Sequence, residues 1–222
     1  MSTLDKAFSI FIKDIRQEWR TRFGVNTILA FIASSLFVVL FSMRADQLSA
    51  ASQSGLLWII ILFACLTSLS RVFVSERERG TLDLLRLNAS PIVVYSGKLL
   101  FSLGLTLFIT FSTSFLFLWI LQSSVYNPAF FFLVLLLGAA GLAGTTTLLS
   151  ALVSQANRTS AIFPVITLPL LIPLLLILIR LTGYAFNPSP AESYLNDLLA
   201  LIGFVGVTIS ASVVLIDTLW DD

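Results

Sequence analysis

The 222-residue sequence contains no histidine, one cysteine and two methionines. Without histidine the chain cannot supply imidazole as a metal ligand or as a general acid or base, and most conventional axial ligation of haem iron is excluded as well. The single cysteine, Cys65, cannot form a disulfide within the chain, and we expect it to have a buried packing role. We therefore expect no metal site, no catalytic residue and no cofactor bound directly by this chain.

Charge is missing over five long stretches, at residues 23–43, 47–70, 99–157, 159–179 and 198–216. A helix needs about 20 apolar residues to cross a bilayer core, so four of these stretches fit one span each. The stretch 99–157 is too long for one span and is broken at Tyr126-Asn127-Pro128. With 57% hydrophobic residues and a mean hydropathy of +0.98, the pattern predicts an integral membrane protein with six spans.

The expected fold is an all-α membrane protein in which residues 1–222 form a single transmembrane domain. Within the chain, residues 3–22 are predicted to form an interfacial helix. The six spans are predicted at about residues 23–43, 54–74, 98–121, 128–153, 160–180 and 197–217.

Basic residues indicate the orientation, because they favour the cytoplasmic side of short loops. An even number of spans puts both termini on one side. If that side is the cytoplasm, only Arg44 and Arg180 of the thirteen basic residues lie outside, so both termini are predicted to be cytoplasmic. Aromatic residues are expected at the two membrane boundaries: Trp58, Trp119, Tyr126, Tyr184 and Tyr194 at the outer one, and Trp19, Tyr95 and Trp220 at the inner one.

The segment Ser2–Arg22 carries acids as well as bases and has no apolar core, so it does not resemble a cleavable signal peptide. Its apolar and basic residues each recur at helical spacing, which is typical of an amphipathic helix lying in the membrane interface. A solvated leader is the alternative. The apolar face consists of Phe8, Ile12, Ile15 and Trp19, and the basic face of Lys6, Lys13, Arg16 and Arg20.

Carriers coupled to protons or ions usually keep a charged residue within a span, and none lies in the middle of these six. A phosphate-binding loop of the Gly-Lys-Ser/Thr type is also absent, because Gly97-Lys98 is followed by Leu99. If this protein moves a substrate uphill, the energy must come from a partner. We therefore expect a transporter subunit and not an enzyme.

The long segment from Arg71 to Lys98 holds five of the thirteen basic residues and three acids, and is the loop best suited to meet such a partner. It is predicted to break at Gly80 and to restart as a short helix over Thr81–Leu87, with Thr81 as the cap and Asp83 near the positive helix end. Ser90 as cap and Pro91 as first residue are predicted to start the helix that leads into the third span.

The sequence Glu76-Arg77-Glu78-Arg79-Gly80-Thr81-Leu82-Asp83-Leu84-Leu85 resembles the coupling segment of ABC-2-type exporter permeases. The resemblance implies a helix that docks in a cleft of an ATPase. Apolar side chains can anchor such a contact while charged ones orient it. The alternative is a charged loop that only solvates the membrane edge. The expected interface consists of Glu76, Glu78, Arg79, Gly80, Thr81, Leu82, Asp83 and Leu85.

The fifth span contains three prolines, Pro164, Pro169 and Pro173. Each proline removes a backbone hydrogen bond and kinks a helix. The pattern Leu168-Pro169-Leu170 with Ile172-Pro173 resembles the CcmB family, the permease subunits of the cytochrome c maturation complex, and so do the chain length and the six spans. Ala89 stands where this family suggests another proline.

The resemblance implies a type V-like ABC permease in a bacterial cytoplasmic membrane or its organellar equivalent. It further implies two copies of this chain with a CcmA-like ATPase that hydrolyses ATP, and CcmC-like and CcmD-like membrane subunits. The implied function is delivery of haem, as a transported or delivered substrate, to the chaperone CcmE, or release of the haem-loaded chaperone. Membrane lipid is an expected contact and nucleic acid is not.

Small residues recur in three spans and are expected to allow close helix packing, with a substrate path or a dimer seam as the alternative. They are Ser102, Thr106, Thr110 and Thr113 in the third span, Gly138, Gly141, Gly144 and Thr145 in the fourth, and Gly203, Gly206 and Ser210 in the sixth.

Three hypotheses for the function follow. The first is a CcmB-like permease. The second is another ABC-2-type exporter, for a lipid, a polysaccharide carrier or a drug, and it shares the Gly80 segment but not the haem-handling partners. The third is a membrane scaffold or small carrier without a nucleotide-hydrolysing partner.

Overall fold

The computed structural model describes residues 3–21, 23–42, 48–69, 80, 90–154, 159–187 and 194–220. These residues form seven helices and no strand, and six of the helices are long and apolar enough to cross a membrane. This confirms the predicted all-α architecture with six spans preceded by a separate N-terminal helix. In chain order the helices are α1 (Thr3–Thr21), α2 (Phe23–Ser42), α3 (Ala50–Leu69), α6 (Pro91–Leu121), α7 (Pro128–Ser154), α8 (Thr159–Phe186) and α9 (Leu195–Trp220).

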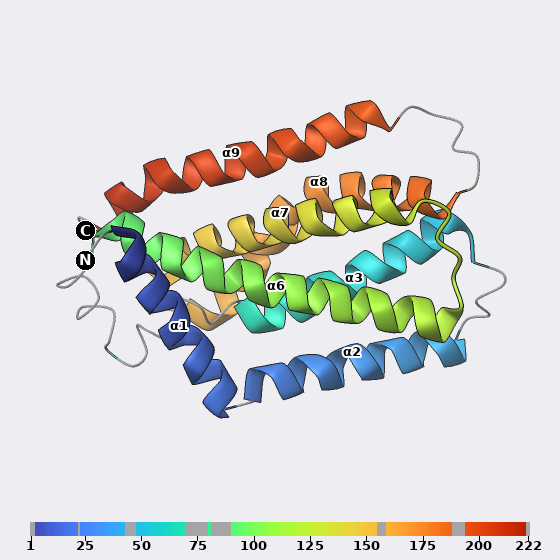
Figure 1. Ribbon diagram of the computed structural model, residues 1–222, viewed down its shortest axis with the longest axis horizontal. Helices are drawn as coiled ribbons and strands as arrows, with labels where there is room; N and C mark the ends of the chain where they lie inside the picture. The colour runs from blue at the N-terminus through green and yellow to red at the C-terminus, as the bar shows by residue number, and fades with distance from the viewer. Residues whose placement is uncertain are drawn as a thin grey trace.

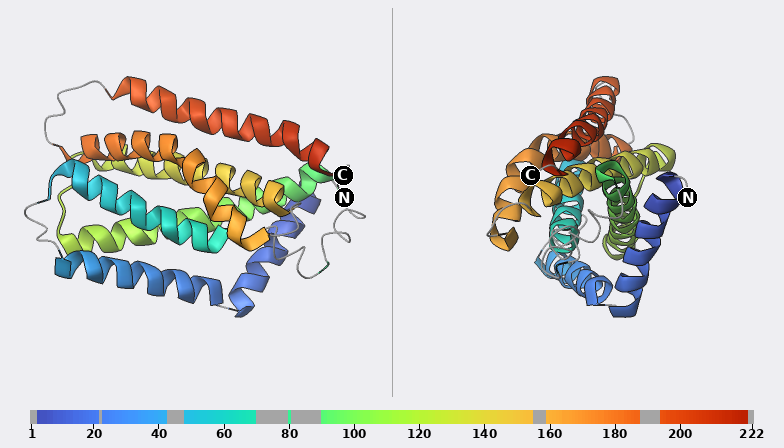
Figure 2. Two further views of the ribbon diagram at one scale, coloured as in Figure 1. Left: turned by 180° about the vertical axis from the view of Figure 1, so that it is seen from behind. Right: turned by 90° about the vertical axis from the view of Figure 1, so that its left-hand side faces the viewer.

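The six spans lie side by side in one bundle, with α2 and α9 at its opposite edges (Figure 1). Helix α7 is the most buried span and packs against α3, α6, α8 and α9. Helix α1 runs steeply across one end of the bundle, as both views of Figure 2 also show. The start of α1 and the end of α9 lie at this same end (Figure 1), which we call the α1 end.

The long charge-free stretch contains two spans, as predicted. Helix α6 ends at Leu121, where Gln122 adopts a left-handed conformation with φ of 50°. Helix α7 begins at Pro128, and the preceding Asn127 caps it by accepting the Phe130 N–H at its side-chain oxygen, 3.1 Å away. The Tyr126 N–H donates to the Ala185 carbonyl at 3.0 Å, which ties this connection to the end of α8.

Two helices continue past the charged residues at which the predicted spans were bounded. Helix α6 begins at Pro91, upstream of Lys98, and the Ser90 carbonyl accepts the Val94 N–H at 3.1 Å. Pro91 is thus the first helical residue, as predicted, but the Ser90 hydroxyl makes no capping bond. Helix α8 runs beyond Arg180, which is exposed and lies 3.9 Å from the Asp197 carboxylate of α9. Lys98 is paired within the protein and the Arg180 side chain points outward, so both charges are accommodated within their helices.

Trp58, which is predicted to lie at the outer membrane boundary, is fully buried among the helices, so its ring does not face lipid. Its indole Nε1 donates to Thr182 Oγ1 at 2.8 Å, and its ring occupies the space beside Gly138, where a Cβ would collide with it. The glycine thereby lets α3, α7 and α8 meet around one indole. By contrast, Trp119 and Tyr126 are exposed, as expected of boundary aromatics.

Candidate functional site

At the α1 end of the bundle, two charged side chains of α1 make contacts with other helices among the described residues. Here α1 packs along the first turns of α6 and reaches the start of α2. Three features build this end: a close approach at Gly97, an ion pair at Lys98 and a helix-capping carboxylate at Glu18. The turn at Gly80 is a separate feature.

The close approach of α1 to α6 depends on Gly97. A Cβ at this position would lie 2.8 Å from the Ala7 carbonyl oxygen and 2.9 Å from the Ile10 Cβ. Ala7 and Ile10 are both buried and share one face of α1, since they are three residues apart in a helix. The absence of a side chain at Gly97 therefore sets how close the two helices can lie.

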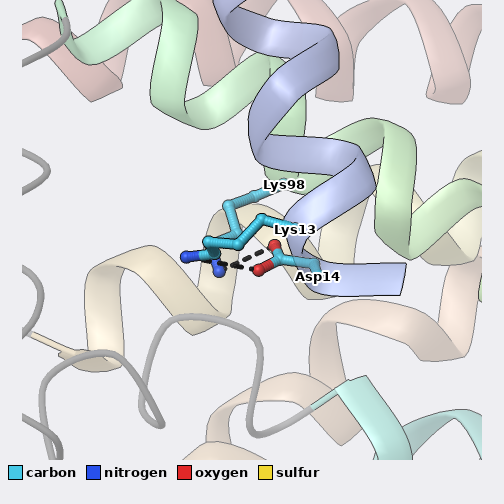
Figure 3. A network of polar contacts seen from close by, with 3 residues as sticks. All are labelled: Lys13, Asp14 and Lys98. Atoms are coloured by element: carbon cyan, nitrogen blue, oxygen red, sulfur yellow. Dashed lines mark ion pairs between the residues drawn. The ribbon is translucent and has the colours of Figure 1, made fainter. Parts of the chain in front are cut away.

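Lys98, the next residue of α6, forms a buried ion pair with α1. Its Nζ lies 2.8 Å from Asp14 Oδ2, and the two side chains are 3% and 7% exposed. Lys13 Nζ approaches the other carboxylate oxygen at 3.4 Å and is more exposed (Figure 3). A buried charge is costly without a partner, so this geometry fixes both the rotation and the position of α1 on α6.

A second carboxylate of α1 holds the start of α2. Glu18 Oε1 accepts the Val25 N–H at 3.0 Å, and a Cβ at Gly24 would collide with this carboxylate. The first N–H groups of a helix have no partner within the helix and carry partial positive charge, so an acceptor there is stabilising. Helix α1 is thus fastened to α6 by Asp14 and to α2 by Glu18.

Gly80 is the one member of the predicted ATPase-coupling interface within the described residues. It lies in a turn with φ of +67°, in the left-handed region that side chains with a Cβ rarely adopt. No heavy atom of the described residues would lie within 4 Å of an added Cβ, so the backbone angle and not crowding favours glycine. The other predicted members, Glu76, Glu78, Arg79, Thr81, Leu82, Asp83 and Leu85, lie outside the described residues.

The three prolines of the predicted kink motif all lie inside α8. Pro169 and Pro173 are exposed on the side of α8 that faces away from the bundle, while Pro164 is half-buried. The opposite face carries fully buried apolar residues, including Leu171 and Leu174. The ribbon of α8 changes direction partway along its length (Figure 2).

The small residues divide into a packed set and an outward set. A Cβ at Gly141 would lie 3.1 Å from Leu174, and one at Gly144 would lie 3.3 Å from Thr208, so these glycines of α7 sit against α8 and α9. Gly203 and Gly206 of α9 are open on the outward side, so for them the packing role within this chain is wrong. Helix α9 packs on α6, α7 and α8 through its other face, so these two glycines face no other span among the described residues.

The hydroxyl stripe of α6 is fully buried. Thr106 donates to the Ser102 carbonyl at 2.7 Å, a local bond that satisfies its hydroxyl within the helix. The hydroxyls of Ser102, Thr110 and Thr113 have no hydrogen-bond partner among the described residues. The stripe therefore faces the interior of the bundle, and its polar atoms are incompletely paired there.

Sequence reasoning missed Asp14 and Glu18 as contact residues. Asp14 follows Ala7 and Ile10 at helical spacing, and Lys98 is the charge that immediately precedes the 59-residue charge-free stretch. Two signals indicate such a pair. One is an acid on the same helix face as Ala7 and Ile10, and the other is an isolated lysine at the start of a span. Their partnership depends on contact between distant segments.

Comparison with known proteins identifies the family of this chain. A sequence model of the family described as CcmB protein matches residues 5–218. The heme exporter protein B of Rhodobacter capsulatus is 32% identical over 175 residues, which cover 76% of this chain and 78% of that protein. The matched range includes α1, the Gly80 segment, the proline-containing α8 and nearly all of α9. The chain belongs to the CcmB family of membrane proteins.

Proposed function

We propose that this chain is the membrane permease subunit of an ABC complex for cytochrome c maturation. In this proposal residues 1–222 form one transmembrane domain, and a separate CcmA-like ATPase binds and hydrolyses ATP. The observation that carries the proposal is membership of the CcmB family over residues 5–218, together with the name of the relative, heme exporter protein B. The chain itself supplies no phosphate-binding loop of the Gly-Lys-Ser/Thr type.

The proposed coupling route begins at the segment around Gly80. Glu76, Glu78, Arg79, Thr81, Leu82, Asp83 and Leu85 would contact the ATPase, with Leu82 and Leu85 in a pocket and the charged residues orienting the contact. This segment joins α3 to α6, which pack against each other. A displacement of the segment would therefore act on both spans at once.

Helix α1 would link the start of α6 to α2, so that the three helices move together when the coupling segment is displaced. The Lys98–Asp14 pair and the close approach at Gly97 fasten α6 to α1, and Glu18 continues the connection to α2. Force applied to α6 would therefore reach α2 through α1. Packed cores and ion pairs of this kind change between discrete arrangements more readily than they deform continuously.

The proposed cargo step is delivery of haem to a CcmE-like chaperone, or release of the loaded chaperone, with CcmC-like and CcmD-like subunits as partners. Because the sequence has no histidine, imidazole ligation of the haem iron would fall to those partners. We propose two copies of this chain per complex, located in a bacterial cytoplasmic membrane or its organellar equivalent. Both termini would be cytoplasmic, in keeping with the shared end of α1 and α9.

Complementation of a strain that lacks this gene tests the proposal. The wild-type chain should restore covalently haem-stained c-type cytochromes, and Leu82→Asp should not, because it places a charge in the proposed apolar anchor. Leu195→Asp, at the opposite end of the bundle on an exposed side chain, is the matched control and should restore them. Normal c-type cytochromes in the deletion strain itself would contradict the proposal and favour another exporter or a scaffold.

A further inference from the structure

Helix α1 has three distinct faces, and only one of them packs on the bundle. Successive residues in an α-helix are about 100° apart around its axis. On this basis the buried, apolar and basic residues of α1 fall into three separate sectors around the helix. The first sector, with Ala7, Ile10 and Asp14, is buried against α6. The second is the apolar face predicted from the sequence, and the third is the basic face.

The described residues leave most of the apolar face uncovered. Trp19 is 73% exposed, Phe8 is 56% exposed and Ile15 is also exposed, although these are among the largest apolar side chains of the helix. Their sector lies about 130° from the buried sector, so the contact with α6 cannot cover them. In a membrane protein such a face at the end of a bundle fits the boundary between headgroups and acyl chains.

The basic face borders this apolar face. Arg16 lies about 60° from Trp19 around the helix, and Arg20 follows Trp19 in sequence. Lys6, Lys13, Arg16 and Arg20 are all exposed. Arginine side chains at such a border place their guanidinium groups at headgroup level when the apolar side chains lie among the acyl chains.

The acids of α1 leave this basic face in excess. Of the three acids of α1, Asp14 pairs with Lys98 and Glu18 caps the start of α2, so these two carboxylates are directed at the bundle. The third, Asp5, is a single exposed carboxylate against the four bases of this face. The contacts of Asp14 and Glu18 prevent α1 from rotating to hide its basic face. The helix therefore presents a fixed cationic edge beside a fixed apolar face.

From this arrangement we infer that α1 selectively binds anionic phospholipid, with Arg16 and Arg20 on the lipid phosphate and Trp19 among the adjacent acyl chains. A guanidinium group matches phosphate oxygens in a bidentate geometry, and the negative charge of the headgroup complements the basic face. Each basic residue near an anionic membrane surface strengthens the binding of the segment to that surface roughly fivefold. The proposal is independent of the cargo and of the ATPase.

Quenching of Trp19 fluorescence by brominated lipid tests this inference. The full chain is reconstituted in vesicles of equal parts phosphatidylcholine and phosphatidylglycerol, with bromine on either one lipid or the other. The Trp19 signal is the difference between wild type and Trp19→Phe, which removes the contribution of the other three tryptophans. We expect brominated phosphatidylglycerol to quench Trp19 several-fold more than brominated phosphatidylcholine, and high salt to reduce this difference.

Substitution of the α1 arginines tests whether the preference for anionic lipid comes from this helix. Arg16→Gln combined with Arg20→Gln should remove the preference for phosphatidylglycerol while Trp19 stays accessible to both labels. Arg180→Gln, which neutralises an exposed arginine of α8, is the control and should keep the preference. Equal quenching by the two labels in the wild type, or a preference that survives the double substitution, would overturn the inference. Equal quenching would also indicate that the basic face serves a protein partner.

Discussion

Lys98 Nζ lies 2.8 Å from Asp14 Oδ2, and this contact joins the N-terminal helix to the base of a membrane span in a buried environment. The two residues are far apart in sequence, and their opposite charges neutralise each other within the bundle. Because neither is solvated, the pair determines where α1 lies on α6.

Removal of one partner of this pair should destabilise the protein strongly. Lys98→Met leaves the Asp14 carboxylate buried, with the more exposed Lys13 as its remaining ion-pair partner among the described residues, and breaking a buried pair typically costs about 3–5 kcal/mol. Asp14→Leu together with Lys98→Met should recover much of this loss, because it removes both charges. Unfolding of Lys98→Met, Asp14→Leu and the double variant in detergent micelles measures the coupling. Additive effects of the single substitutions would contradict an energetic pair.

Gly97→Ala should displace α1 from α6. The new methyl group would meet the Ala7 carbonyl and the Ile10 side chain, so we expect a loss of about 1–3 kcal/mol of stability from overpacking. Gly104→Ala is the matched control in the same helix, since no heavy atom lies within 4 Å of its added Cβ. It should be neutral or slightly stabilising, because alanine favours helix formation more than glycine. Equal thermal stability of the two variants would count against the close approach.

Gly138→Ala should disturb the meeting point of α3, α7 and α8. The added Cβ would collide with the Trp58 ring, and the indole would have to move away from Thr182 Oγ1. We expect a loss of about 1–3 kcal/mol and a shift of tryptophan emission as the indole is displaced. Gly203→Ala, at an open position of α9, controls for the change of residue type. An unchanged emission spectrum in Gly138→Ala would argue against the packing described for Trp58.

Substitutions at Gly80 should separate backbone conformation from side-chain contact. With φ of +67°, Gly80→Ala should cost about 1–2 kcal/mol locally, whereas Gly80→Asn should cost less, because asparagine tolerates the left-handed region. If this turn positions the ATPase-coupling segment, production of c-type cytochromes should fall in the order glycine, asparagine, alanine. Valine should be the most damaging, because a β-branched residue is least tolerant of this angle. An order that follows side-chain size alone would contradict a conformational role.

The number of spans and the N-terminal amphipathic helix could be predicted because they depend on local patterns. Charge-free length decides whether a segment can cross a bilayer, and helical spacing decides which residues share a face. The break at Tyr126-Asn127-Pro128 likewise follows from residue types that cap and start helices.

The contacts that build the α1 end could not be predicted, because they depend on which distant helices meet. The sequence predicts a helix from Pro91 that passes Lys98 into the third span, but the pairing of Lys98 with Asp14 depends on where α1 packs. Elsewhere in the bundle, the burial of Trp58 could not be predicted, because the space for its ring is provided by Gly138 on another helix. Such cases require the three-dimensional arrangement as well as the residue types.

The most direct test of the central claim is to identify what copurifies with the chain. The wild type and Leu82→Asp would be extracted gently from their native membrane, with Leu195→Asp as control, and the bound proteins identified by mass spectrometry. The account predicts an ABC ATPase together with CcmC-like and CcmE-like proteins on the wild type and the control, and loss of the ATPase from Leu82→Asp. An ATPase without the haem-handling partners would indicate a general exporter, and absence of any ATPase from the wild type would contradict the account.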